Sequence, residues 1–198
     1  MKRSNIILLS VIGLLAMIFF WGCGKYNNII GNDEKVNNAW GNVQTAYQMR
    51  ADLIPGLIAS VQAGAKNEKE ILENVTKARA GIAEAKKDIA DAVTPEQMDN
   101  AGRKINSAFT LAVESYPQIK GTELFKDLQV SLSGVESRIN TARNDYNNLV
   151  KDYNISIRRF PGSIVASFGG FSTKEMFKST AGAEKGIDVR GEFKKGEN

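Results

Sequence analysis

Residues 125–157 read FKDLQVSLSGVESRINTARNDYNNLVKDYNISI, and this stretch decides the fold. Its apolar residues recur in alternating steps of three and four across more than four heptads. That spacing predicts one long helix with coiled-coil-like packing. The predicted seam consists of Phe125, Leu128, Leu132, Val135, Ile139, Ala142, Tyr146, Leu149, Tyr153 and Ile157.

The preceding chain carries the same helical period. A first seam runs from Val36 to Val61 and contains Pro55, which must either kink the helix or end it near residues 52–54. Because the apolar positions continue beyond the proline, we expect a kink.

Two further helices follow, each with a start signal. Asn67 with Glu70 suggests a capping box for the second, and Thr94-Pro95-Glu96-Gln97 suggests one with proline at the first helical position for the third. The connections are short, so successive helices should run antiparallel. The predicted class is all-α: an elongated, antiparallel up-down four-helix bundle over residues 25–159, without a sheet.

The N-terminus predicts a membrane anchor over residues 1–24. Lys2 and Arg3 precede an uncharged run, and its apolar part from Ile6 to Gly24 would reach about 28 Å as a helix, close to the hydrocarbon thickness of a bilayer. With the positive charges on the N-terminal side, the remaining chain should lie outside the cytoplasm, in the periplasm or the extracellular space.

Two forms of this anchor stay open. The run can be an uncleaved membrane helix, or Phe20-Trp21-Gly22-Cys23 can act as a loose lipobox, with cleavage before Cys23 and a lipid on its thiol. Gly22 suits a lipobox, whereas Phe20 and Trp21 are bulky for one. Cys23 is therefore a possible lipidation site.

Composition excludes several classes of function. The chain has no histidine, which removes the commonest metal ligand and the usual general base, and its single cysteine cannot form an intrachain disulfide. Without Lys2 and Arg3, the net charge of +4 falls to +2, too small to indicate a nucleic-acid partner. We expect no cofactor, no metal and no catalytic residues.

The chain changes character after Arg159. Residues 160–171 are apolar, rich in glycine and without helical period, and predict an irregular segment. Ser172 and Glu175 suggest the cap of a short helix within residues 160–178, and residues 179–198 predict a disordered tail. The irregular segment should cover the membrane-proximal ends of the first and fourth helices. The aromatic residues of this region either close the end of the bundle or contact a membrane or a partner. The candidate contacts are Arg158, Arg159, Phe160, Phe168, Phe171 and Phe177.

Together, a set of short motifs resembles the LemA family. These are Tyr26-Asn27, Ala39-Trp40, Val43-Gln44, Tyr47, Arg50, Asp52-Leu53-Ile54-Pro55, Ala78-Arg79, Glu114, Tyr116-Pro117, Ala142-Arg143, Tyr146-Asn147, Tyr153-Asn154 and Phe160-Pro161. The resemblance implies a bacterial protein with one N-terminal membrane segment, a helical domain and no established enzymatic activity. It also implies association with another envelope or membrane protein.

We therefore expect a membrane-anchored interaction or scaffold protein of the bacterial envelope. The alternative is an accessory protein that binds a peptide or lipid in a pocket between helices. Four carboxylates of the family pattern, Glu34, Asp52, Glu70 and Glu114, fall on different helices and should cap helices or pair with arginines. Trp40, Tyr146 and Tyr153 should pack in the core.

Overall fold

The computed structural model describes residues 3–64 and 69–178, and every regular element within those ranges is helical. In chain order these are α1 (Arg3–Gly64), α2 (Lys69–Asp91), α3 (Pro95–Ser115), the 3₁₀ turn η1 (Pro117–Gly121), α4 (Glu123–Arg158) and α5 (Gly162–Gly169). The all-α prediction is confirmed. The predicted Asn67 cap and the tail at 179–198 lie outside the described residues.

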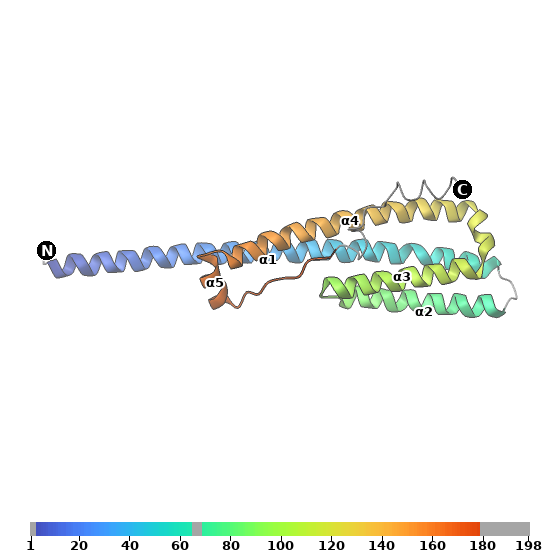
Figure 1. Ribbon diagram of the computed structural model, residues 1–198, viewed down its shortest axis with the longest axis horizontal. Helices are drawn as coiled ribbons and strands as arrows, with labels where there is room; N and C mark the ends of the chain where they lie inside the picture. Colours follow the sequence, from blue (N-terminus) through green and yellow to red (C-terminus); the bar gives the residue numbers. More distant parts are fainter. Residues whose placement is uncertain (1–2, 65–68, 179–198) are drawn as a thin grey trace, which may run out of the picture.

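The arrangement is elongated and centred on α1. Figure 1 shows α1, α2, α3 and α4 alternating in direction along one axis. The helix α4 packs along α1, α2 and α3 pack on each other as a hairpin, and that hairpin packs on α1. The contacts show a long helix pair with a shorter hairpin beside it. The uniform four-helix bundle stays a prediction.

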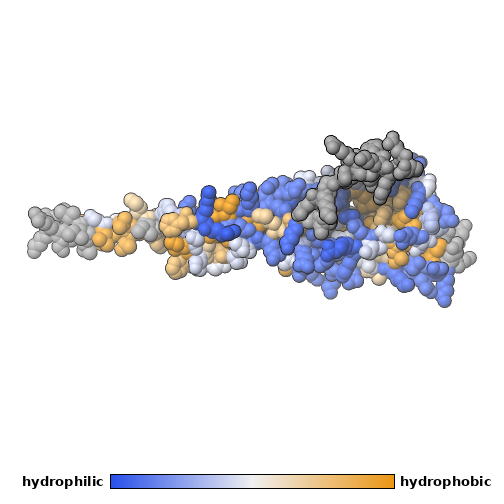
Figure 2. Space-filling model, viewed as in Figure 1, coloured by the Kyte–Doolittle hydropathy of each residue, from blue (hydrophilic) through white to orange (hydrophobic). Residues whose placement is uncertain are grey.

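The helix α1 is a single element of 62 residues, about 93 Å long at the usual rise. Pro55 lies inside it, so an end near residues 52–54 is excluded. Of the described residues, α1 alone forms a helix long and apolar enough to cross a membrane. The apolar side chains of its N-terminal part are exposed, and Figure 2 shows them on the narrow end of the molecule: Leu9, Val11, Ile12, Leu14, Leu15, Met17, Phe19, Phe20 and Trp21.

The buried side chains follow the predicted seams closely. In α2 and α3, Val75, Ile82, Met98 and Ile105 are buried, as their spacing predicts. In α4, Val150 is buried where Leu149 was predicted, and Leu149 is half-buried. Tyr146 and Tyr153 on either side are buried as predicted, so the difference is confined to this turn of α4. The coiled-coil geometry of the α1–α4 pair stays a prediction.

The predicted caps are present where they can be seen. The Thr94 hydroxyl accepts from the Gln97 amide at 3.3 Å, and the Gln97 side chain accepts from the Thr94 amide at 3.1 Å. These two bonds satisfy amides that an open helix end would leave unpaired.

Two predictions for the C-terminal segment are wrong. Residues 162–169, expected to be irregular, form α5, because Gly162 and Ala166 place a small buried face against α1 and α4. Residues 172–178, expected to form a short helix, are extended. Gly170 ends α5 with φ of 71°, a left-handed conformation that favours glycine. The extended segment then runs back along the molecule, away from the N-terminal part of α1 (Figure 1).

Candidate functional site

The residues proposed as membrane or partner contacts separate into two groups. Phe160 and Phe168 are 81% and 91% exposed, and Arg158 and Arg159 are exposed beside them. Phe177, by contrast, is buried. The prediction that Phe177 contacts a membrane or a partner is therefore wrong, because its ring packs inside the domain.

The exposed group lies around α5, at the end of the domain next to the N-terminal apolar run of α1. Phe171 lies half-buried, with its ring centroid 5.5 Å from that of Tyr26 on α1. Tyr26 is two residues beyond Gly24, where the apolar run ends. The exposed aromatic rings of Phe160 and Phe168 thus flank the part of the helix that leaves the predicted membrane segment.

Residues 171–178, which we call the strap, are held by side chains of α4. Asn154 Nδ2 donates to the carbonyl of Lys174 at 2.9 Å, and Asn154 Oδ1 accepts from the Lys174 amide at 2.9 Å. Asn147 makes the same pair of bonds with the amide and carbonyl of Phe177, at 2.8 and 3.0 Å. Two asparagine side chains therefore read the strap main chain as a neighbouring β-strand would.

Two further bonds reach strap carbonyls. The Tyr146 hydroxyl donates to the carbonyl of Glu175 at 3.1 Å, and Arg143 Nη2 donates to the carbonyl of Lys178 at 3.2 Å. Burial raises the pKa of Tyr146, and the negative charge of Glu175 raises it further.

Phe177 anchors the strap in an aromatic box. Its ring stacks on Trp40 at 5.8 Å between centroids and meets the Tyr146 ring edge-on at 5.5 Å. The Arg143 guanidinium lies 4.6 Å from its centroid. The indole Nε1 of Trp40 donates to the carbonyl of Ala92 at 3.2 Å, which fixes one wall of the box. Trp40 is half-buried, while Tyr146 and Tyr153 lie in the core as predicted.

Lys174 provides the second side-chain contact of the strap. Its ammonium pairs with Asp33 at 2.7 Å, donates to Asn37 Oδ1 at 2.8 Å and lies 5.4 Å from the Tyr153 ring centroid. The strap therefore binds through a basic residue, Lys174, and an aromatic residue three positions later, Phe177, each in its own set of contacts.

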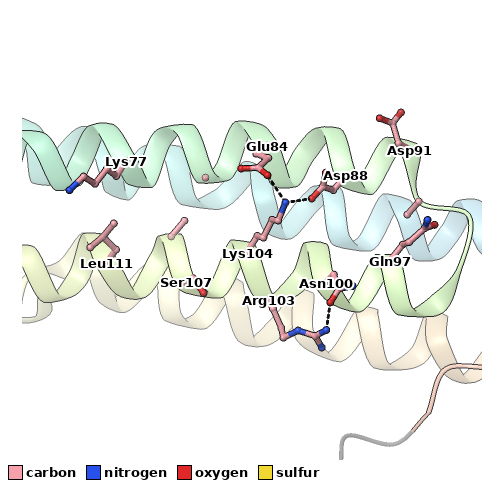
Figure 3. Close-up of a pocket in the computed structure, with 13 residues that line it drawn as sticks. Lys77, Glu84, Asp88, Asp91, Gln97, Asn100, Arg103, Lys104, Ser107 and Leu111 are labelled. Atoms are coloured by element: carbon pink, nitrogen blue, oxygen red, sulfur yellow. Dashed lines mark hydrogen bonds and ion pairs between the residues drawn. The ribbon is translucent and has the colours of Figure 1, made fainter.

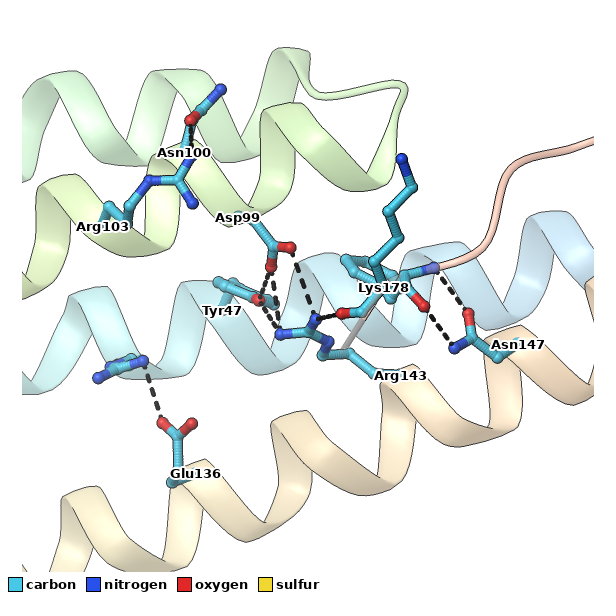
Figure 4. A network of polar contacts seen from close by, with 10 residues as sticks. Tyr47, Asp99, Asn100, Arg103, Glu136, Arg143, Asn147 and Lys178 are labelled. Carbon is cyan, nitrogen blue, oxygen red and sulfur yellow. Dashed lines mark hydrogen bonds and ion pairs between the residues drawn. The ribbon is translucent and has the colours of Figure 1, made fainter. Parts of the chain in front are cut away.

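Below the aromatic box, a polar cluster joins three helices (Figure 4). Arg143 of α4 pairs with Asp99 of α3 at 3.1 Å, and the Tyr47 hydroxyl of α1 donates to the same carboxylate at 3.1 Å. Burial raises the pKa of Tyr47 to about 12; the nearby Arg143 charge lowers it, while the charge of Asp99 raises it. The cluster links α1, α3 and α4 through side-chain contacts.

The family carboxylates do not gather into one site. Asp52 pairs with Lys86 at 2.6 Å, and Arg50 pairs with Glu136 at 3.0 Å. The predicted partners are therefore different: Asp52 pairs with a lysine, while Arg50 and Arg143 pair with Glu136 and Asp99. Neither Glu136 nor Asp99 was singled out from the sequence, since spacing alone does not pair helices. Glu34 and Asp52 also lie on the same helix, α1, and not on different helices as predicted. Within the described ranges, no group of three or more metal-ligating side chains lies close enough to hold a metal ion.

A shallow depression of about 780 Å³ lies between α2 and α3 (Figure 3). Lys104 spans it, with Nζ 2.5 Å from Glu84 and 2.7 Å from Asp88, and hydrogen bonds first to Asp88 and then to Glu84 raise the pKa of its ammonium. These ion pairs are exposed to solvent, which is typical of a solvated helix surface.

The strap receptor was not predicted, although the sequence holds a signal for it. The Tyr146-Asn147 and Tyr153-Asn154 pairs are seven residues apart. The heptad spacing of buried residues accounts for the two tyrosines but not for the asparagines. The asparagine after each tyrosine repeats at the same interval, and its polar side chain indicates a main-chain partner beside the seam.

Comparison with known proteins agrees with these motifs. The model of the LemA family matches residues 39–190, most of the chain. Magnetosome protein MamQ 2 of Paramagnetospirillum magneticum is 27% identical over 192 residues, covering 86% of this chain and 69% of that protein. Protein LemA of Metamycoplasma hominis is 24% identical over 153 residues, covering 77% and 68%. Magnetosome protein MamQ of Magnetospirillum gryphiswaldense is 23% identical over 201 residues, covering 89% and 74%. The chain therefore belongs to the LemA family.

Proposed function

We propose that this protein is anchored in a bacterial membrane by its N-terminus and holds a helical domain outside the cytoplasm, where it binds another envelope or membrane protein. One observation carries the proposal. The exposed apolar segment and the central helix of the domain are parts of the same continuous helix, α1. A membrane-embedded N-terminus would therefore orient the whole domain rigidly. The similarity to magnetosome proteins supports an association with membranes.

Association, and not catalysis, is the proposed activity. The family carboxylates Glu34, Asp52, Glu70 and Glu114 do not form one site, Asp52 pairs with a lysine, and the chain lacks histidine. The most specialised contacts on the domain instead hold an extended piece of polypeptide.

The orientation follows from Lys2 and Arg3, which the positive-inside rule leaves in the cytoplasm. We propose to test it with Val130→Cys in a Cys23→Ser background, because Val130 is 74% exposed on α4, far from the anchor. A membrane-impermeant maleimide should label this cysteine in intact spheroplasts. Labelling only after lysis would reverse the proposed orientation.

The form of the anchor is settled by the mass of the mature N-terminus. An intact Met1 excludes the lipoprotein form, whereas a chain that begins with a lipidated Cys23 excludes the uncleaved helix. Either result agrees with membrane attachment. Recovery of the unmodified full chain from a soluble cytosolic fraction would contradict the proposal.

We further propose that α5 rests on the membrane surface. Ile164 and Phe168 are exposed on this apolar helix, and Arg158 and Arg159 beside it can meet anionic headgroups. A fluorophore on Phe168→Cys, again with Cys23→Ser, should be quenched by brominated lipids when the full chain is in nanodiscs. The same fluorophore on Val130→Cys is the matched control. Equal quenching at both positions, or none at either, would reject the contact.

The protein that binds the domain can be identified by crosslinking in native membranes. A photo-crosslinking residue at position 168 or 176 should capture the same polypeptide repeatedly, because both positions lie on exposed surfaces next to the proposed contacts. Capture of lipid alone would favour a purely membrane-binding role.

A further inference from the structure

We infer that the groove under the strap is a binding site for an extended peptide segment of another protein, and that residues 171–178 occupy it as a built-in competitor. The inference rests on the proposed function only in that it names the kind of partner.

Recognition is directed mainly at the main chain. Asn147, Asn154, Tyr146 and Arg143 all bond to strap carbonyls or amides, and these groups are present in any polypeptide. The side chains of Ser172, Thr173 and Met176 are exposed. Most of the strap sequence is therefore not read, and a different sequence can satisfy the same donors and acceptors.

The spacing of the asparagines matches an extended chain in general. One heptad of helix rises about 10.5 Å, and three residues of extended chain span about 10 Å. Asn154 and Asn147 accordingly meet Lys174 and Phe177, three residues apart. The asparagine repeat continues to Asn140, which stands one heptad further along α4 and is exposed.

The strap fills its groove incompletely. A hollow of about 350 Å³ lies beside it, with Val36, Trp40, Pro95 and Tyr146 among its lining residues. At this place the strap carries Glu175, whose side chain is exposed. An apolar side chain in that position would bury surface that the strap leaves open. A peptide with a basic residue, then an apolar one, then any residue and then an aromatic one therefore suits the groove better than the strap does.

The strap can detach without unfolding a helix. It follows Gly170, which ends α5, and Phe177 is its one buried side chain among the described residues. As a tethered segment it acts at an effective concentration of roughly millimolar, so it blocks weak ligands and yields to better ones. Competition in cis would limit binding to peptides with the favoured pattern.

The test uses the full chain in nanodiscs and fluorescent peptides spanning residues 171–178. In a Phe177→Ala chain the tethered strap loses its anchor, so the peptide should bind at least about tenfold more tightly than it binds the unchanged chain. Asn147→Ala or Asn154→Ala in that background should each weaken binding about tenfold, since each removes two hydrogen bonds. Circular dichroism checks that each variant keeps its helices.

Two modified peptides distinguish recognition of the peptide main chain from non-specific hydrophobic binding. N-methylation of the amides at positions 174 and 177 removes the donors to Asn154 and Asn147 and should abolish binding. Methylation at 176, whose amide makes no hydrogen bond with the described residues, should leave binding intact and is the matched control. A Glu175→Leu peptide should bind about tenfold more tightly through the hollow.

Several results would overturn the inference. They are no binding to a folded Phe177→Ala chain, equal binding of both methylated peptides, or no gain from Glu175→Leu. Exchange of straps between copies of this chain, seen as a dimer that Phe177→Ala dissolves, would show that the occupant in trans is a second copy and not another protein. None of these readouts depends on membrane orientation, so the proposed function can fail separately.

Discussion

Replacing Gly102 with alanine tests the packing that positions the polar cluster. Gly102 is buried in α3, and a Cβ built on it would lie 2.8 Å from Cε1 of Tyr47, closer than such atoms approach in real structures. The ring belongs to the cluster with Asp99 and Arg143, so it cannot shift without stretching those contacts. Overpacking of this kind costs about 1–3 kcal/mol, against about 1 kcal/mol gained when alanine replaces glycine in a helix.

The expected net effect is a loss of about 1 kcal/mol, or roughly 2–4 °C in melting temperature for a domain of this size. The matched control is Gly134→Ala on α4, where no atom lies within 4 Å of the new Cβ. It should gain about 1 kcal/mol. Thermal unfolding of the full chain in detergent micelles, followed by circular dichroism at the helix band, measures both.

A double mutant isolates the clash itself. In a Tyr47→Leu background the alanine at 102 no longer meets a ring, so its cost should disappear and the two changes should couple by about 1–2 kcal/mol. If Gly102→Ala melts at or above the temperature of the parent, or the coupling is absent, the Tyr47 ring does not require a glycine at position 102 and the reasoning is refuted.

Three further outcomes follow from the same contacts. The folded-state pKa of Tyr47 is raised from 10.0 to about 12, so the stability that its protonated hydroxyl contributes is fully present below about pH 10 and is lost as pH rises to about 12. Across that window the free energy of unfolding of the parent should fall by about 3 kcal/mol more than that of Tyr47→Phe, measured by urea unfolding at each pH. Parallel stability curves for the two proteins would contradict this. Arg143→Lys keeps the charge but cannot reach Asp99, Tyr47 and the Lys178 carbonyl together, so limited proteolysis should cut the strap faster, and an unchanged rate would count against its role. Thr94→Ala removes the capping hydroxyl and should cost about 1 kcal/mol in thermal unfolding, whereas Thr94→Ser should cost little.

The sequence by itself determined the helices and their buried faces. Apolar spacing of three and four predicts the buried positions of α2 and α3, and Thr94-Pro95-Glu96-Gln97 predicts the start of α3, because both signals act within a few residues of chain. The predicted anchor depends equally on a local property, the apolar run of α1. The short sequence motifs of the chain also indicated the LemA family.

Only the tertiary structure decided what residues 160–178 do. The sequence of residues 162–169 predicts no helix, yet they form α5 because their small residues pack against α1 and α4. Residues 172–178 carry a capping pattern, yet they are extended because Asn147 and Asn154, on a distant part of the chain, satisfy their main-chain groups. Local propensity is worth tenths of a kcal/mol per residue, so a partner from elsewhere in the fold outweighs it. The pairing of Arg143 with Asp99 has the same origin, since which helices meet and in what register is set by packing and not by spacing along the chain.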